Sequence, residues 1–296
     1  MIAPIVAGTD GSEESLAAVE WAAREAGRRR VPLCIVHVVD HQRGPETARA
    51  QPMRHHRAGR FHHDLPHQAR SALARARHRA AEAAPGVDLR AAAVFGRADQ
   101  VLTALTVRAP LVAVGRRGTG GPGPRLGSVA LSLACHASGP VVFAPVGAGR
   151  VLEEIVVGID DCDHATAALE FGFGEADVRG ARLTALHVWT HPHPGQLDGY
   201  HDWILSIDPV NEGAATLLSE QVAPWRDKYP GVIVTESTVH GHPGRVLGLA
   251  SRGADLIVVG GRRSELAPAP DLDPVSYAML HHTQCPVALI PGGLSR

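Results

Sequence analysis

The sequence predicts an α/β protein made of two similar domains in tandem, each an open five-stranded parallel sheet flanked by helices. Two observations lead to this fold class. The chain repeats itself over a whole-domain length: IVAGTD at residues 5–10 returns as IVVGID at 155–160, which indicates a duplicated domain. Within each half, short β-branched runs alternate with helical stretches, the pattern of a parallel sheet covered by helices.

The first half begins with a strand at residues 5–8. Ser12 is expected to cap the following helix, because Glu13 and Glu14 lie in its first turn and favour the positive end of the helix dipole. Gly27 is the expected C-terminal stop. The other predicted elements are strand 33–39, helix 68–84, strand 89–94, helix 98–108, strand 111–115, helix 128–137 and strand 141–144.

The second half repeats this order after a linker at residues 146–153, so the predicted domains are 1–146 and 153–296. Its strands are expected at 155–159, 182–189, 232–239, 256–260 and 286–290, and its helices at 164–179, 212–228, 243–252 and 275–282. Parallel connections are right-handed, and ligands of such sheets bind beyond the carboxyl ends of the strands. Asp10, Asp160 and the loop after the fourth strand are expected at that end.

The composition excludes some functions. The chain has 296 residues, 45% of them hydrophobic, and a net charge of −1, so neither nucleic acid nor a membrane is an expected partner. No secretory signal pattern is visible. The cysteines are scattered without a CxxC pair, which favours reduced thiols and a cytoplasmic location; they are Cys34, Cys135, Cys162 and Cys285.

A glycine-rich segment, GRRGTGGPGPRLGS at residues 115–128, connects a predicted strand to a predicted helix. Glycines let the backbone approach an anion closely and point several N–H groups inward. Gly127 and Ser128 would begin the helix, so its positive dipole end and a hydroxyl would face a phosphate. Nearby arginines add positive charge, at 116, 117 and 125. The segment is not a Walker A loop, and a flexible surface loop is the alternative interpretation.

With the repeat, the order of elements and this loop together, the chain resembles the universal stress protein family in its tandem two-domain form. The resemblance covers nearly the whole chain, and its carriers are GTDGS at 8–12, Gly96, GHP at 241–243, the loop glycines and PVV at 140–142. It implies that each domain has a Rossmann-like fold of the adenine nucleotide alpha hydrolase type. It also implies ATP as the ligand, alone or with Mg²⁺.

ATP-binding members of this family share a pattern of the form G-x2-G-x9-G-[ST]. In this chain only eight residues separate the second glycine of the pattern from the third. By resemblance, phosphate contacts fall on the loop, and base or ribose contacts fall on Asp10 and on Val38 or Val39. Capping of the first helix is the alternative role of Asp10. The loop residues of the predicted site are Gly115, Gly118, Gly127, Ser128 and Val129.

The second half departs from the pattern. Arg263 stands where the second glycine belongs, and Asp273 and Pro274 stand where Gly-Ser belongs. Asp271 and Asp273 would repel phosphate, and Pro274 lacks a backbone donor at the helix start. The second domain is therefore expected to hold no nucleotide and to be a structural or regulatory partner of the first.

Histidines gather between residues 41 and 67. They suggest a segment that binds metal or senses pH, or alternatively a polar insertion. Because their spacing matches no zinc geometry, we predict no metal site. His37 and His187, at corresponding places in the two halves, are expected to be structural. No set of catalytic side chains stands out, so at most weak ATP hydrolysis is expected.

These observations predict a cytoplasmic, ATP-binding regulatory protein of the stress response, with one nucleotide site in residues 1–146. The tandem chains are expected to form a homodimer, and the protein partner is unknown. Two alternatives remain at this stage. One is a nucleotide-free module that acts through protein interactions, and the other is a slow nucleotide hydrolase.

Overall fold

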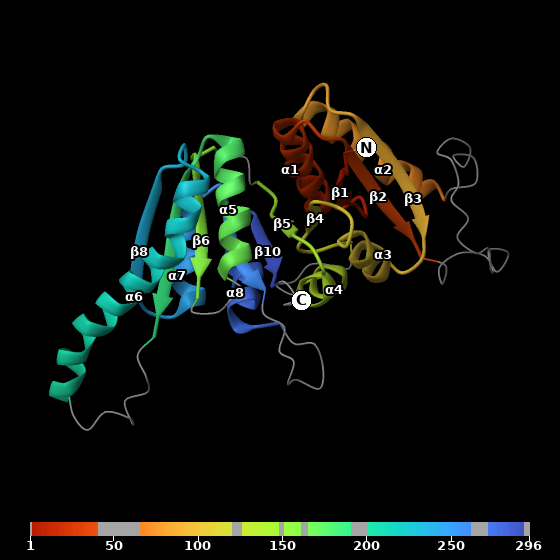
Figure 1. The fold of residues 1–296 in the computed structure, drawn as a ribbon. Helices are drawn as coiled ribbons and strands as arrows, with labels where there is room; N and C mark the ends of the chain where they lie inside the picture. Colours follow the sequence, from red (N-terminus) through yellow and green to blue (C-terminus); the bar gives the residue numbers. More distant parts are fainter. Residues whose placement is uncertain are drawn as a thin grey trace. The chain divides into compact units, whose positions relative to one another are not determined.

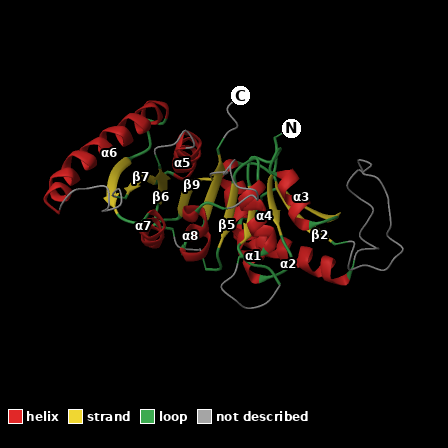
Figure 2. Ribbon diagram, turned by 90° about the horizontal axis from the view of Figure 1, so that it is seen from below, coloured by secondary structure: helices red, strands yellow, loops and turns green. Residues whose placement is uncertain are grey.

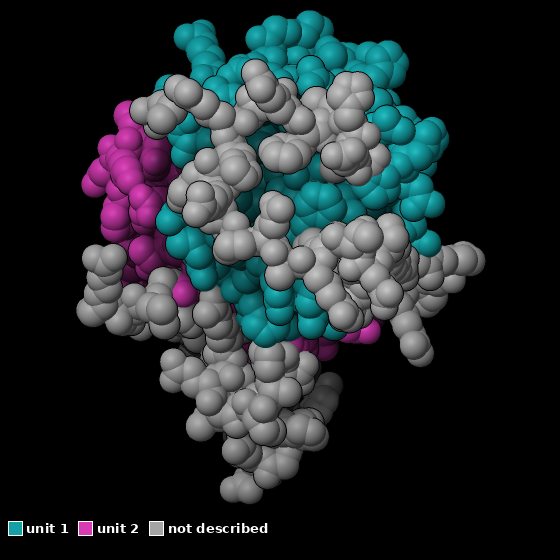
Figure 3. Space-filling model, turned by 90° about the vertical axis from the view of Figure 1, so that its right-hand side faces the viewer, with its two compact units in different colours: residues 1–147 teal, residues 148–296 magenta. Residues whose placement is uncertain are grey.

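The computed structural model describes residues 2–40, 66–119, 126–147, 151–160, 165–190, 200–261 and 272–292, with the side chains of 200–212 left out. Residues 41–65 of the histidine-rich segment lie outside this range, as do Arg125, Cys162, Arg263 and Asp271. The chain divides into two compact units, residues 1–147 and 148–296 (Figure 3).

Unit 1 contains a five-stranded parallel sheet with the strand order β3-β2-β1-β4-β5 (Figure 1). The chain passes from β1 to β2 and β3 on one side, and then returns to place β4 and β5 on the other side of β1. The elements are β1 (Ile5–Gly8), α1 (Glu13–Arg29), β2 (Leu33–Val39), α2 (His67–Ala83), β3 (Leu89–Phe95), α3 (Ala98–Leu105), β4 (Val112–Gly115), α4 (Ser128–His136) and β5 (Val141–Ala144).

Unit 2 repeats this arrangement with the order β8-β7-β6-β9-β10, again with parallel neighbours. The α/β class with five parallel strands per half is therefore confirmed. The elements are β6 (Glu154–Ile159), α5 (Ala165–Arg179), β7 (Arg182–Trp189), α6 (Tyr200–Lys228), β8 (Val234–His240), α7 (Pro243–Ala250), the 3-10 helix η4 (Ser251–Gly253), β9 (Leu256–Gly261), α8 (Pro274–His282) and β10 (Val287–Pro291).

Helices cover both faces of each sheet (Figure 2). In unit 1, α1 packs with α2 and α3 packs with α4, and the corresponding helices pair in the same way in unit 2. The central strands are buried on both faces, as their near-continuous apolar sequences predict. Ile5, Ala7 and Val112 have no exposed surface, and neither do Ile155 and Val157 at the centre of unit 2.

The start of α1 is as predicted, but its end is not. The Ser12 hydroxyl accepts a hydrogen bond from the Ser15 N–H, which confirms the N-cap. Gly27 lies inside the helix, so its assignment as the stop was wrong. The left-handed position after the helix belongs to Arg30, with φ 54°, whereas unit 2 has Gly180 there, with φ 64°.

Helix α6 also differs from the expectation. It begins at Tyr200 rather than at residue 212, and it continues through Pro209 and Gly213. Both residues disfavour a helix interior, which is why the sequence indicated a later start. Among the described residues, no helix is long and apolar enough to cross a bilayer.

Candidate functional site

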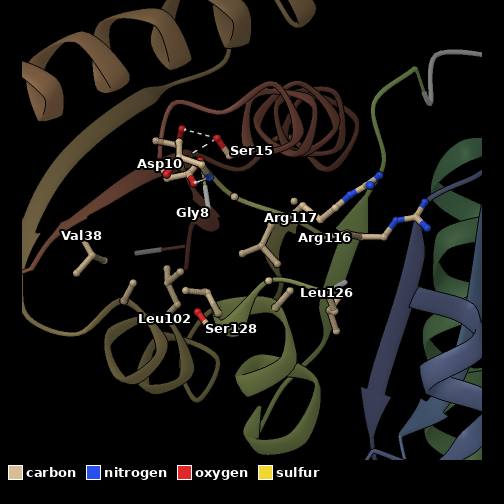
Figure 4. Close-up of a pocket in the computed structure, with 18 of the residues that line it drawn as sticks. Gly8, Asp10, Ser15, Val38, Leu102, Arg116, Arg117, Leu126 and Ser128 are labelled. Atoms are coloured by element: carbon tan, nitrogen blue, oxygen red, sulfur yellow. Dashed lines mark hydrogen bonds between the residues drawn. The ribbon is translucent and has the colours of Figure 1, made fainter. Parts of the chain in front are cut away.

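A cavity of about 690 Å³ opens in unit 1 beyond the carboxyl ends of β1 and β4 (Figure 4). These strands are neighbours in the sheet, and the strand order reverses between them. Ligands of open α/β sheets bind at such a point. The volume falls within the range of small-molecule sites, which runs from about 300 to 1,000 Å³.

One wall of the cavity is apolar. Val36 and Val38 of β2 line it, together with Val114 of β4 and with Ala98 and Leu102 of α3. Successive side chains of a strand point to opposite faces of the sheet. Val39 therefore faces away, and it is the one predicted site residue that does not line the cavity.

Another part of the cavity lining is the N-terminus of α4, beside Leu102 (Figure 4). Gly127 is its N-cap, with φ −67° and ψ 150°, and among the described residues no side chain caps this helix. Ser128, Val129 and Ala130 of its first turn line the cavity. The first N–H groups of a helix have no partner within the helix, and the dipole makes this end positive. The arrangement favours an anion.

The corresponding helix of unit 2 has its own anion. Asp273 caps α8 with φ −59° and ψ 152°, nearly the backbone conformation of Gly127. Its carboxylate accepts hydrogen bonds from the N–H groups of Val275 at 3.0 Å and Ser276 at 2.9 Å. The carboxylate thus takes the place at the helix start that a phosphate would need.

Asp10 lines the cavity at the end of β1 and contacts the glycine-rich loop. Its Oδ2 accepts the N–H of Thr119 at 2.8 Å, and its Oδ1 accepts the N–H and the hydroxyl of Ser12 at 2.9 and 2.6 Å. Burial of the carboxyl acts to raise its pKa, but these hydrogen bonds outweigh burial and hold the pKa below its ordinary value. Asp10 is therefore ionised at neutral pH.

Three loop residues are placed differently from their expected roles: Gly115, Arg116 and Arg117. Arg117 forms an ion pair with Glu14 at 3.1 Å, and the guanidinium groups of Arg116 and Arg117 extend away from Ser128 (Figure 4). Gly115 lies against α1: a Cβ there would be 2.7 Å from the Glu14 carbonyl carbon. Its glycine is therefore explained by helix packing.

His37 and His187 hold corresponding strand ends. The Nδ1 of His37 lies 2.8 Å from the carbonyl oxygen of Thr9, and that of His187 lies 3.1 Å from the carbonyl oxygen of Ile159. A carbonyl oxygen only accepts, so Nδ1 is the protonated nitrogen in both rings. The bonds support the expected structural role.

The fold thus brings together the predicted Asp10, Val38 and the five predicted loop residues. Sequence reasoning missed Ser15, Thr119, Val36, Ala98 and Leu102, which also line the cavity. Strand alternation could have found Val36 beside Val38, but the helical residues carry no such signal. In the described parts of the chain, no group of three or more His, Cys, Asp or Glu residues could hold a metal ion.

Comparison with known proteins gives the family. The profile of the Universal stress protein family matches residues 1–145 and 152–291. Universal stress protein Rv1996 of Mycobacterium tuberculosis H37Rv is 31% identical over 300 residues, covering 96% of this chain and 93% of the relative. Rv2623 of the same strain is 32% identical over 264 residues, covering 87% and 86%. The chain is a tandem α/β protein and belongs to the universal stress protein family.

Solved structures show the same fold. A universal stress protein from Archaeoglobus fulgidus has a TM-score of 0.67 at 16% identity, and the match covers 99% of this chain and 98% of that one. A universal stress protein solved in complex with cAMP covers 49% of this chain and 98% of its own, at 26% identity and a TM-score of 0.36.

Proposed function

We propose that unit 1 binds ATP, with the phosphates at the N-terminus of α4 and the base against the apolar wall. One observation carries this proposal: the start of α4 has no side-chain cap and faces a cavity, whereas the start of α8 is capped by Asp273. Gly127 leaves open the anion position that unit 2 fills with a carboxylate.

The cavity supports a nucleotide rather than a small anion. An inorganic phosphate would use only the helix start, while a nucleotide also uses the wall formed by Val36, Val38 and Leu102. Asp10 adds an acceptor at the far side from Ser128 (Figure 4). A carboxylate accepts hydrogen bonds from ribose hydroxyls or from an amino group.

The proposed role is regulatory. Among the described residues that line the cavity, Asp10 is the only carboxylate, and three hydrogen bonds keep it ionised. A carboxylate stabilised in this way is a weak general base. We therefore expect ATP to be retained rather than turned over, and its occupancy to alter the state of unit 1 that a partner recognises. Mg²⁺ is often held by one carboxylate together with nucleotide phosphates, so binding is to be compared with and without it.

Calorimetric titration of the full chain with ATP tests the proposal. We expect one site per chain, because the Asp273 carboxylate already occupies the start of α8, where a phosphate would bind in unit 2. Two equivalent sites would contradict the assignment to unit 1. No binding by the folded chain would favour a nucleotide-free interaction module, the alternative suggested by the shortened loop. ATP consumed by the chain in a Mg²⁺-dependent way would favour a hydrolase.

We further propose that the protein acts in the cytoplasm in the stress response, as a homodimer of tandem chains. The described cysteines Cys34, Cys135 and Cys285 form no disulfide, which suits a reducing compartment. Light scattering on the purified chain measures the oligomeric state directly, and a monomer at micromolar concentration would contradict the dimer.

A further inference from the structure

The glycine-rich loop already binds an anion, and that anion belongs to the chain itself. The Thr119 N–H donates to Asp10 Oδ2 at 2.8 Å, across more than one hundred positions of sequence. On the other oxygen, Ser12 donates through both its N–H and its hydroxyl. The carboxylate is thereby oriented from both sides.

Gly118 shows that the loop is shaped to this carboxylate. A Cβ on Gly118 would lie 2.5 Å from Asp10 Oδ2, closer than non-bonded atoms approach. Gly118 is not among the glycines with positive φ, so its backbone conformation does not require glycine. By contrast, a Cβ on Gly127 would meet its nearest atom, the Arg116 carbonyl oxygen, at 3.4 Å, an ordinary contact. The second motif glycine thus makes room for Asp10.

We propose that Asp10 ties the start of the glycine-rich loop to the end of β1, and that Ser12 is the positioning residue that aims its carboxylate. The tie consists of the contact of Asp10 with Gly118 and Thr119. It fixes the rim of the cavity before any ligand arrives. The tie is inferred from these contacts alone, whereas its contribution to ATP affinity rests on the proposed function.

The tie depends on a second acceptor oxygen. An amide side chain has one oxygen and one NH₂ group and carries no charge. Asp10→Asn therefore keeps the size, but it offers Thr119 a neutral acceptor in place of a charged one or, when the oxygen turns to Ser12, no acceptor at all. Gly118→Ala breaks the same contact by steric conflict and leaves the carboxylate intact. Gly127→Ala is the matched control for an added methyl in this loop.

Hydrogen exchange of the Thr119 amide, followed by NMR without nucleotide, tests the tie. Loss of a hydrogen bond to a charged acceptor should speed exchange about tenfold or more in Asp10→Asn and in Gly118→Ala. Gly127→Ala should exchange like the wild type. Ser12→Ala should also speed exchange, and Ser12→Thr should restore it, since either hydroxyl can donate to Oδ1. Amide spectra of the β-strands confirm that each variant is folded.

Unchanged Thr119 exchange in folded Asp10→Asn and Gly118→Ala would overturn the tie. If the Thr119 amide still exchanges fast in Ser12→Thr while α1 remains capped, the positioning role of Ser12 is overturned. ATP titration then tests whether the tie contributes to ATP binding. We expect Gly118→Ala to weaken ATP binding about tenfold. Wild-type affinity in that variant would refute the idea that the tie prepares the loop for ATP. If the wild type binds no ATP while exchange behaves as expected, the proposed function fails and the tie stands.

Discussion

Gly127→Asp transfers to unit 1 the feature that closes the helix start of unit 2. The two positions share nearly the same backbone conformation, and Asp273 shows what a carboxylate does there: it accepts the N–H groups of Val275 and Ser276. The corresponding donors of α4 belong to Val129 and Ala130. The added Cβ meets only ordinary contacts, so the variant should fold.

The substitution should stabilise the protein while it removes the ligand. Asp in place of Gly at an N-cap, with its charge at the helix start, adds about 0.5 to 1 kcal/mol to the free energy of unfolding. That corresponds to a rise in melting temperature of about 1 to 4 °C. For ATP, two hydrogen bonds to a charged phosphate are lost, each contributing about 1.5 to 3 kcal/mol. Affinity should therefore fall by about two to four orders of magnitude.

Two assays on the same samples separate these effects. Calorimetry gives the dissociation constant for ATP, and thermal unfolding without nucleotide gives the melting temperature. Gly127→Asn serves as the control, because its amide caps a helix without adding charge. It should raise the melting temperature as well, and it should weaken ATP binding less than the carboxylate does.

Wild-type ATP affinity in Gly127→Asp would refute the placement of the phosphates at α4. A lowered melting temperature would refute the equivalence of Gly127 and Asp273. The two outcomes are independent, so each part of the reasoning is tested by itself.

Three further predictions concern stability, each measured by urea or thermal unfolding. Asp273→Ala should lower the free energy of unfolding by about 1 kcal/mol through loss of the α8 cap, whereas Asp273→Asn should largely retain the wild-type value; an equal loss in the two variants would mean that the capping hydrogen bonds are not its source. Arg30→Gly should raise the free energy of unfolding by about 1 kcal/mol, because φ is 54° there, and Gly180→Ala should lower it by a similar amount. An unchanged free energy of unfolding in either variant would contradict the cost of a non-glycine residue in the left-handed conformation. Hydrogen bonds keep the folded pKa of Asp10 below its ordinary value of 3.8 despite burial. The folded state therefore binds this proton less tightly than the unfolded state, so the contribution to stability is complete above pH 3.8 and disappears as pH falls through the lower folded pKa. The acid slope of unfolding should be shallower in Asp10→Asn, and an identical slope would exclude Asp10 as its source.

Much of the fold is readable in the sequence because its signals are local. The apolar strands at 5–8 and 155–159, the Ser12 cap and the alternation of strands and helices depend on neighbouring residues, and the repeat indicates that both halves share one topology. Local signals also misled at two helix ends. The end of α1 at Gly27 and the start of α6 were predicted wrongly, because propensity is a weak signal beside tertiary packing.

For the candidate site, too, the sequence determined some features and the tertiary structure determined others. By itself the sequence determined which loop carries the motif, and it showed that Asp273 and Pro274 interrupt the second copy. Only the tertiary structure decided what individual residues do. Gly115 makes room for α1, and Gly118 makes room for Asp10. These roles arise from contacts between segments far apart in the chain, and no local pattern specifies which atoms meet across that distance.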